Sequence, residues 1–302
     1  MKDIRHKLLL FLRGVAMGAV DLVPGISAGT IAFVTGIYEE LIHAIKSFNL
    51  DALKTLKKQG FVAAWRYING EFLLILISGI LFSLFALAGV MGFLLEQYPL
   101  QLWSFFIGLI IASVIYLLRQ HPPVKPIQAG LLAAGILMAY GLSQSPASTA
   151  EGSYLSLFFA GSIALCAMIL PGISGSFILV LLGLYPLFIN ALIHFEWDFL
   201  LTFAAGGVIG LMLFSRVLSW LLTHYKDAVI ATMCGFLVGS LSVLWPWKQS
   251  GSIGIVNLTP QSYLELVGQN PQTLSCILWF LVGLIAVLVV EMIGYSLKSK
   301  SV

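Results

Sequence analysis

The sequence predicts an all-α polytopic membrane protein built as an inverted repeat, each half comprising one re-entrant helical hairpin and three transmembrane helices. Three observations predict this fold. The 302 residues are 59% hydrophobic and only 10% charged, whereas a soluble domain carries about 25% charged residues. A Pro-Gly-Ile-Ser motif occurs twice in apolar surroundings. Lysine and arginine are concentrated in alternate connecting segments.

The doubled motif indicates an internal duplication. Pro24-Gly25-Ile26-Ser27 recurs 147 positions later as Pro171-Gly172-Ile173-Ser174. Between 24–45 and 171–192, nine of 22 positions are identical without a gap. Both copies continue into a Gly-x-Tyr triplet, so the match includes glycine, proline, serine and tyrosine in one register, which we interpret as a repeat.

Each copy of the motif predicts a helix that stops and a second helix that begins. Proline lacks a backbone donor and forces the preceding residue out of the helical region, so the arriving helix ends there. Pro24-Gly25 and Pro171-Gly172 are turn pairs whose glycine is free to adopt a positive φ. Ser27 and Ser174 then stand at the N-cap position of a new apolar run. A simple proline kink in a spanning helix is the alternative.

The first repeat is expected over residues 1–145 and the second over 146–302, together forming one integral membrane domain. In the first, 8–23 is too short to span, since about 20 residues are needed, so 8–45 is predicted to be a re-entrant hairpin. Residues 46–70 are basic and amphipathic, which predicts a segment on the membrane surface. The remaining predicted elements are spans at 72–95, 100–118 and 127–142, a second hairpin at 154–193, and spans at 199–222, 229–245 and 274–297.

The distribution of basic residues predicts the topology. Segments rich in lysine and arginine favour the cytoplasm. If each hairpin enters and leaves on one side, all basic segments fall in the cytoplasm, including both termini, and the basic-poor segments fall outside. Three spans per repeat then invert the second half relative to the first, which is typical of secondary transporters. The basic segments are 2–13, 46–66, 119–125, 226 and 298–300.

Two helix N-termini meeting near the midplane would form an anion site. Each N-terminus offers unpaired N–H groups and about half a positive charge, and phosphate suits such a place. The alternative is that the two N-termini only cap each other. The residues expected at this site are Ser27, Gly29, Thr30, Ser174, Gly175 and Ser176.

Three charged residues are further candidates. Arg216 lies inside the apolar stretch 199–222, where an arginine by default faces the bundle interior or a water-filled cavity; snorkelling to the cytoplasmic surface is its alternative. Asp21 precedes the first break by three residues and is assigned to coupling or gating as a carrier of a proton or cation, with an ion pair to Arg216 or a simple cap as the alternatives. Glu39 is assigned to coupling or gating near the cytoplasmic mouth, with a solvated helix end as the alternative.

The sequence offers no catalytic constellation. We find no nucleophile–base pair, phosphate-binding P-loop or metal-ligand spacing, so we predict no enzyme activity, no metal and no cofactor. The tryptophans Trp103, Trp245 and Trp247 fit interfacial aromatic belts.

The doubled motif resembles the signature of the PopT family of polyprenyl-phosphate transporters. The resemblance rests on Gly18-x-x-Asp21-x-x-Pro24-Gly25-Ile26-Ser27-x-Gly29-Thr30, on Pro171-Gly172-Ile173-Ser174-Gly175-Ser176, and on Gly239-Ser240-Leu241 leading to Trp245-Pro246-Trp247. Ala28 departs from the usual glycine but remains small. The resemblance implies a flippase that returns undecaprenyl phosphate from the outer to the inner leaflet, recycling a lipid carrier of cell-envelope synthesis such as peptidoglycan. It also implies a bacterial cytoplasmic (inner) membrane location.

Two other functions stay open from the sequence. A membrane undecaprenyl-pyrophosphate phosphatase has a similar motif but carries an arginine after the serine, where Ala28 and Gly175 stand here. A secondary transporter of a small anion is the other. The expected partners are the lipid phosphate and membrane lipid, with no nucleic acid; proton or sodium coupling and a homodimer are open alternatives.

Overall fold

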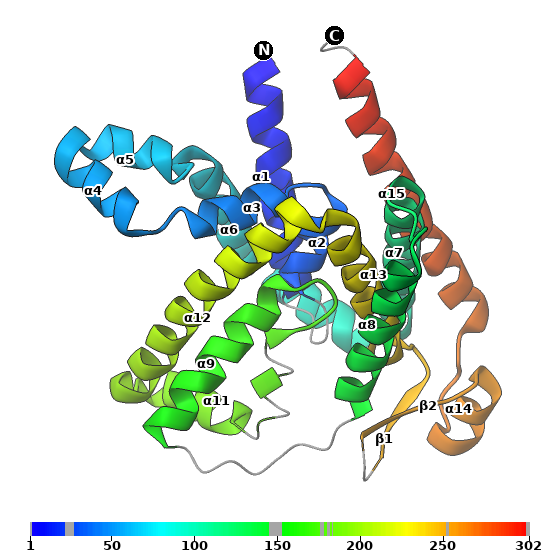
Figure 1. The fold of residues 1–302 in the computed structure, drawn as a ribbon. Coiled ribbons are helices and arrows are strands. Elements are labelled where there is room, and N and C mark those ends of the chain that lie inside the picture. The colour runs from blue at the N-terminus through cyan, green and yellow to red at the C-terminus, as the bar shows by residue number, and fades with distance from the viewer. Residues whose placement is uncertain are drawn as a thin grey trace. The chain divides into compact units, whose positions relative to one another are not determined.

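The computed structural model describes residues 2–21, 27–144, 153–175, 178–179, 182, 184–251 and 254–299 (Figure 1). Three predicted site residues, Pro24, Gly25 and Ser176, lie outside these described residues.

The described chain is mostly helical, as predicted. The helices of the first half are α1 (Lys2–Asp21), α2 (Ala28–Val34), α3 (Tyr38–Lys46), α4 (Leu50–Gln59), α5 (Phe61–Tyr67), α6 (Gly70–Gln97), α7 (Pro99–Gln120) and α8 (Pro126–Gln144). The second half contains α9 (Tyr154–Ile169), α11 (Tyr185–His194), α12 (Trp197–His224), α13 (Lys226–Leu244), β1 (Lys248–Gly251), β2 (Gly254–Asn257), α14 (Pro260–Val267) and α15 (Thr273–Ser299).

Five of the described helices are long and apolar enough to cross a membrane, which makes this a multi-pass membrane protein. Four of these helices contain a predicted span, α13 covers all but the last residue of the predicted span 229–245, and the sixth predicted span, 274–297, falls within α15. Within α15 the apolar stretch Thr273–Val289 is shorter than a span, so the last crossing stays a prediction. The five helical stretches are Gly70–Leu87, Pro99–Gln120, Pro126–Gln144, Trp197–His224 and Lys226–Leu244.

Within the predicted hairpin 8–45, the part that follows the break contains two short helices, α2 and α3. Gly36 adopts a φ of +76° between α2 and α3, a conformation that glycine tolerates without strain. Tyr38 begins α3 and Tyr185 begins α11, so the Gly-x-Tyr triplet of each repeat marks the same helix start. The duplicated sequence therefore produces duplicated local structure.

The chain divides into two compact units, and each draws on both halves of the sequence. The first unit contains Met1–Gly89 and Ala147–Val229, and the second contains Val90–Pro146 and Ile230–Val302. The hairpin of each predicted repeat and the helix that follows it thus belong to the first unit. The second and third predicted spans of each repeat belong to the second unit.

Within the first unit, glycines allow two closely similar helix crossings. A Cβ at Gly14 of α1 would overlap the Leu76 carbonyl oxygen of α6, and one at Gly79 would overlap that of Phe11. In the crossing of α9 with α12, a Cβ at Gly161 would overlap the Phe203 carbonyl oxygen. A Cβ at Gly206 would overlap that of Phe158. The offsets are 147 for Gly14 to Gly161 and 127 for Gly79 to Gly206, which are the offsets of the sequence repeat. Small residues at such crossings let membrane helices approach backbone to backbone.

The second unit contains another matched pair of crossings. Gly108 of α7 abuts the Phe280 carbonyl of α15, while Gly235 of α13 abuts the Leu132 carbonyl of α8. Gly108 and Gly235 are again 127 positions apart. The second span of each predicted repeat therefore packs on the third span of the other.

Residues 246–273 contain structure that the sequence did not predict. Strands β1 and β2 form an antiparallel hairpin, with Lys248 opposite Asn257. Trp247 is buried with Leu100, Tyr263 and Cys276, and its indole N–H donates to the Pro271 carbonyl at 2.8 Å. Trp247 is thus part of a small apolar core, whereas an interfacial belt was expected.

Candidate functional site at the paired motifs

The first motif forms a helix start, as predicted. Ser27 is the N-cap of α2, and its hydroxyl accepts the Gly29 N–H at 3.1 Å. The Ser27 carbonyl accepts the Thr30 N–H at 2.9 Å. Both Ser27 and Thr30 are fully buried. A serine N-cap satisfies backbone donors that would otherwise stay unpaired at a buried helix end.

The second motif forms the predicted break. Helix α9 ends at Ile169, and Leu170 before the proline is extended, with φ −68° and ψ 128°. Gly172 takes a positive φ of +84°, and the Ser174 carbonyl accepts the Ile178 N–H at 3.1 Å, as at the start of a helical turn. A Cβ at Gly175 would lie 2.7 Å from the Ala164 carbonyl oxygen, so the chain after the break packs on α9.

The fold brings the two motifs into direct contact. The Ser27 hydroxyl donates to the Met168 carbonyl, and the Gly172 N–H donates to the Thr30 hydroxyl at 3.0 Å. Gly29 lies so close to α9 that a Cβ would overlap the Ile169 carbonyl oxygen. Residues separated by more than 140 positions therefore form one buried polar cluster.

The described contacts differ from the predicted meeting of two helix N-termini. The start of α2 lies against the last carbonyls of α9, those of Met168 and Ile169. Pro171 ends α9 and leaves these carbonyls without helical donors, which is the signal that sequence reasoning overlooked. The positive end of one helix dipole thus faces the negative end of another.

Asp21 lies at this helix start as well. Its carboxylate accepts a hydrogen bond from the Ala28 backbone N–H, the first of α2. Asp21 is the last residue of α1, so its carboxylate links the end of α1 to the start of α2 across the first break. A carboxylate therefore already occupies part of the place at which an anion was expected.

Arg216 is exposed on α12, and among the described residues it forms no hydrogen bond or ion pair with the motif cluster. The neighbouring side chains Leu213, Val217 and Trp220 are also exposed. Eight residues separate Arg216 from the end of α12 at His224, about 12 Å at 1.5 Å per residue. An arginine stem can cover such a distance in part by extending toward the polar surface.

Glu39 forms a half-exposed ion pair. Its carboxylate lies 2.6 Å from the Lys226 ammonium, which belongs to the start of α13. Glu39 is also in the first turn of α3, where a negative charge is favoured by the helix dipole. These contacts correspond to the solvated helix end considered from the sequence.

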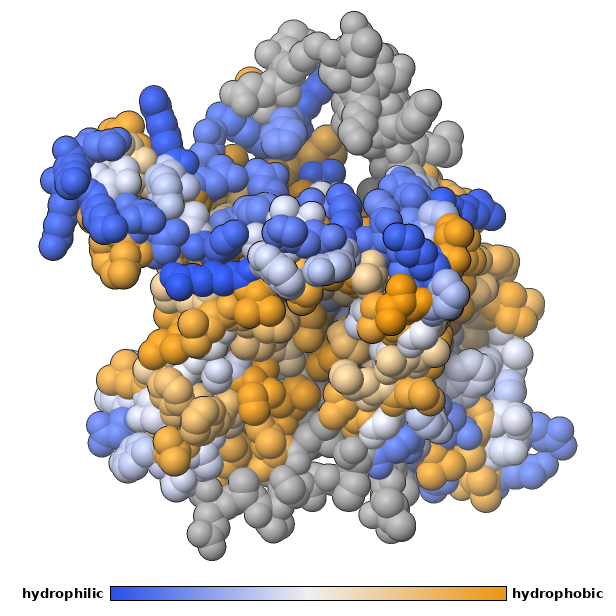
Figure 2. All heavy atoms as spheres, in the orientation of Figure 1, coloured by the Kyte–Doolittle hydropathy of each residue, from blue (hydrophilic) through white to orange (hydrophobic). Residues whose placement is uncertain are grey.

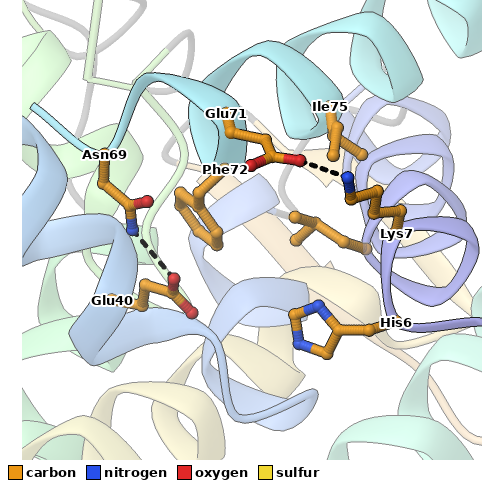
Figure 3. Close-up of a pocket in the computed structure, with 8 residues that line it drawn as sticks. His6, Lys7, Glu40, Asn69, Glu71, Phe72 and Ile75 are labelled. Atoms are coloured by element: carbon orange, nitrogen blue, oxygen red, sulfur yellow. Dashed lines mark hydrogen bonds and ion pairs between the residues drawn. The ribbon is translucent and has the colours of Figure 1, made fainter. Parts of the chain in front are cut away.

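A separate polar cavity of about 130 Å³ lies between α1, α3 and α6 (Figure 3). Lys7 and Glu71 form an ion pair across it at 2.5 Å, and the Asn69 amide donates to Glu40 at 2.9 Å. Across the described part of the chain, no cluster of three histidine, cysteine or acidic residues could hold a metal ion. The cavity is lined by His6, Lys7, Leu10, Glu40, Asn69, Glu71, Phe72 and Ile75.

The fold and the paired broken segments define a multi-pass helical membrane protein with a duplicated core. The chain belongs to the undecaprenyl phosphate translocase-like family, described as VCA0040-like, which matches residues 17–262. The resemblance noted from the motifs is thereby confirmed.

Two curated relatives support the assignment. The polyprenyl-phosphate transporter of Vibrio cholerae serotype O1 is 42% identical over 292 residues, covering 93% of this chain and 95% of the relative. That of Staphylococcus aureus is 32% identical over 260 residues, covering 80% of this chain and 87% of the relative. No solved structure matches the chain.

Proposed function

We propose that this protein transports polyprenyl phosphate, specifically undecaprenyl phosphate, from the outer to the inner leaflet of the bacterial cytoplasmic membrane. The family and both relatives support the substrate class. The observation that carries the mechanism is the buried contact of the two motifs, in which Thr30 accepts the Gly172 N–H and Ser27 donates to Met168.

The motif cluster is, in this proposal, the closed form of the headgroup site. The hydroxyls of Ser27 and Thr30 hold protein groups here, and a phosphate would replace those partners when the motifs separate. Ordinary hydrogen bonds contribute only about 1 kcal/mol each, while bonds to an ionised phosphate are roughly twice as strong. The exchange is therefore favourable once a headgroup enters between Ser27, Gly29 and Thr30 on one side and Ser174, Gly175 and Ser176 on the other.

Asp21 would gate this exchange. Its carboxylate bonds the first N–H of α2, which a phosphate would also seek, and two negative charges in one buried place repel. Binding of the headgroup therefore requires that Asp21 leave the helix start or take up a proton. Movement or protonation of Asp21 would each couple headgroup binding to a change at the first break. Protonation of Asp21 would also couple headgroup binding to protons.

Alternating access requires the topology predicted from the sequence. Both hairpins would be re-entrant and the two repeats inverted, with both termini cytoplasmic, so that the motif cluster lies near the midplane. The equivalent glycine crossings of α1 with α6 and α9 with α12 support the repeat. Arg216, exposed toward the apolar side of α12, would meet the headgroup as it moves to or from the lipid.

Leaflet exchange in vesicles tests the proposal. Purified protein is reconstituted with a fluorescent polyprenyl phosphate, and the outer leaflet is bleached by an impermeant reductant. Full bleaching with active protein, against half bleaching in protein-free vesicles, is the expected result. Phosphate release from polyprenyl pyrophosphate would instead indicate a phosphatase. Uptake of inorganic phosphate without lipid exchange would indicate a small-anion transporter.

A further inference from the structure

The most distinct surface feature outside the motif cluster is the helical pair α4–α5, which we call the arm (residues 50–67). Helices α4 and α5 pack on each other and extend away from α3 and α6 in Figure 1. The arm has no counterpart in the second half of the sequence, where only a short connection, 195–196, joins α11 to α12. It is therefore an addition to the first repeat.

The arm is a defined structure and is fixed at its base. The Asn49 side chain accepts the backbone N–H groups of Asp51 and Ala52 and donates to the Tyr67 hydroxyl at 3.2 Å, joining the start of α4 to the end of α5. The Trp65 ring packs on the Gly70 backbone, where a Cβ would overlap it. The arm is thus held at the first residue of α6.

Large apolar side chains on the arm are exposed. No residue of α4 is buried, and Leu50 and Phe61 retain 72% and 68% of their accessible surface. A monomeric soluble protein rarely exposes such a group of large apolar side chains without a partner. The exposed apolar residues of the arm are Leu50, Leu53, Leu56, Phe61 and Val62, with Tyr67 beside them.

Basic side chains flank the leucines of α4: Lys58 lies about 140° around the helix from Leu53, and Lys57 lies about 40° from it. The arm's charged residues are Lys54, Lys57, Lys58 and Arg66 against a single acid, Asp51, which pairs with Lys54 at 2.9 Å. Figure 2 shows hydrophilic residues gathered at the outer end of the arm and hydrophobic residues along its lower side, the side on which the apolar surface of α12 begins. This separation is the pattern of a helix that lies in a membrane interface.

We propose that the arm docks on anionic membrane lipid, with its leucines in the acyl boundary and Lys57, Lys58 and Arg66 at the headgroups. The chain geometry selects lipid over a protein partner. Only Ile68 and Asn69 separate α5 from α6, whose Gly70–Leu87 stretch is a candidate span. The arm is therefore confined to the level at which α6 leaves the membrane. The inference does not depend on the transported substrate.

The test uses the full chain, with Cys166, Cys234 and Cys276 replaced by alanine, in nanodiscs with or without anionic phosphatidylglycerol. A fluorescent label is placed by Leu53→Cys on the apolar side, or by Lys58→Cys about 140° around the helix. Lipids carrying a nitroxide on the acyl chain quench a label that contacts them. We expect quenching at position 53 and not at 58, and stronger quenching in the anionic discs.

A charge variant separates lipid recognition from simple burial. Lys57→Gln with Lys58→Gln and Arg66→Gln should weaken docking by about fivefold for each charge removed, in anionic discs only. Arg119→Gln in the last turn of α7, combined with Lys125→Gln in the α7–α8 connection, is the control and should change nothing. The proposal is overturned if the label at 53 stays in water in both discs. It is also overturned if quenching at position 53 is the same with and without anionic lipid and is unchanged in the charge variant. A label at position 53 that contacts neither lipid nor water would also overturn it, because that result would indicate a protein partner.

Discussion

Thr30 and Gly172 are 142 positions apart, yet the Gly172 N–H donates to the Thr30 hydroxyl at 3.0 Å inside the protein. The two residues belong to different copies of the motif, so this bond joins the duplicated halves at their most similar sequence. Thr30 has no exposed surface, so the acceptor of this part-buried bond is shielded from water.

Removing the Thr30 hydroxyl should loosen this junction. Thr30→Val leaves the part-buried Gly172 N–H without its acceptor, which costs at most about 1–3 kcal/mol. We expect faster hydrogen exchange at the Gly172 amide and a lower unfolding temperature. Thr30→Ser keeps the acceptor and should restore slow exchange; protection at Gly172 that is the same in all three proteins would contradict the bond.

Gly29→Ala should separate the motifs by steric overlap. The added Cβ would meet the Ile169 carbonyl oxygen, and overpacking of this kind costs about 1–3 kcal/mol. We expect reduced thermal stability and slow leaflet exchange of polyprenyl phosphate. Gly89→Ala is the matched control because a Cβ at Gly89 meets nothing within 4 Å. Equal stability of the two variants would show that α2 does not approach α9 this closely.

Asp21→Asn should strengthen headgroup binding and impair turnover. Asparagine keeps an oxygen for the Ala28 N–H but removes the charge that repels phosphate. We expect polyprenyl phosphate to bind at least about tenfold more tightly, a change of about 1.4 kcal/mol, with slower net transport. Binding is measured by titration in detergent, with Glu265→Gln as a control. Unchanged affinity would remove Asp21 from the headgroup site.

Arg216→Ala should abolish transport while the protein stays folded. The loss of a cation that meets the headgroup removes charge neutralisation in a low-dielectric place. Arg216→Lys keeps the charge and should retain partial activity, whereas Leu213→Ala on the same exposed side should be near normal. Leaflet exchange is the measurement, and full activity of Arg216→Ala would exclude a role in transport.

Lys248 should make stability depend on pH in the alkaline range. Its ammonium lies 3.9 Å from the Trp103 ring centre and donates to the Val243 carbonyl, and burial lowers the Lys248 pKa from 10.5 to about 8. Below pH 8 the folded and unfolded lysines are both charged, and the cost of burying the charge is fully present. Between about pH 8 and 10.5 the unfolded lysine alone keeps its proton, so stability rises with pH.

Unfolding midpoints at pH 7, 8.5 and 10 measure this effect. Other groups titrate in the same window, so the comparison is with Lys248→Met, which should lack the part of the rise that Lys248 causes. Lys57→Met on the exposed arm should behave as the parent protein. A parallel pH dependence of Lys248→Met and the parent would contradict the lowered pKa.

The local features of the site could be predicted from the sequence, because they follow from residue types. Pro171 fixes the extended conformation of Leu170, Gly172 supplies the positive φ, and Ser27 supplies the cap. The contacts between distant parts of the chain could not be predicted from the sequence. The phase of an apolar helix such as α12 carries no signal when nearly every side is apolar, so the exposure of Arg216 was not predictable.

Some features were missed although a signal was present. Gly36 lies between two apolar runs, and a glycine at a helix end commonly takes a positive φ, so this residue signalled the boundary between α2 and α3. The pairing of Ser27 with Met168 depends on how the repeats fold together, which no spacing within one repeat specifies.

The glycine crossings restrict how the protein can change shape. Gly161 and Gly206 let the backbones of α9 and α12 touch. If one helix slid along the other, backbone carbonyl groups of one would collide with Cα atoms of the other. The same holds for α1 and α6 at Gly14 and Gly79. Each pair of helices must then move as one rigid body. The hinge motion needed to expose a headgroup must therefore occur in the short non-helical segments 35–37 and 170–173.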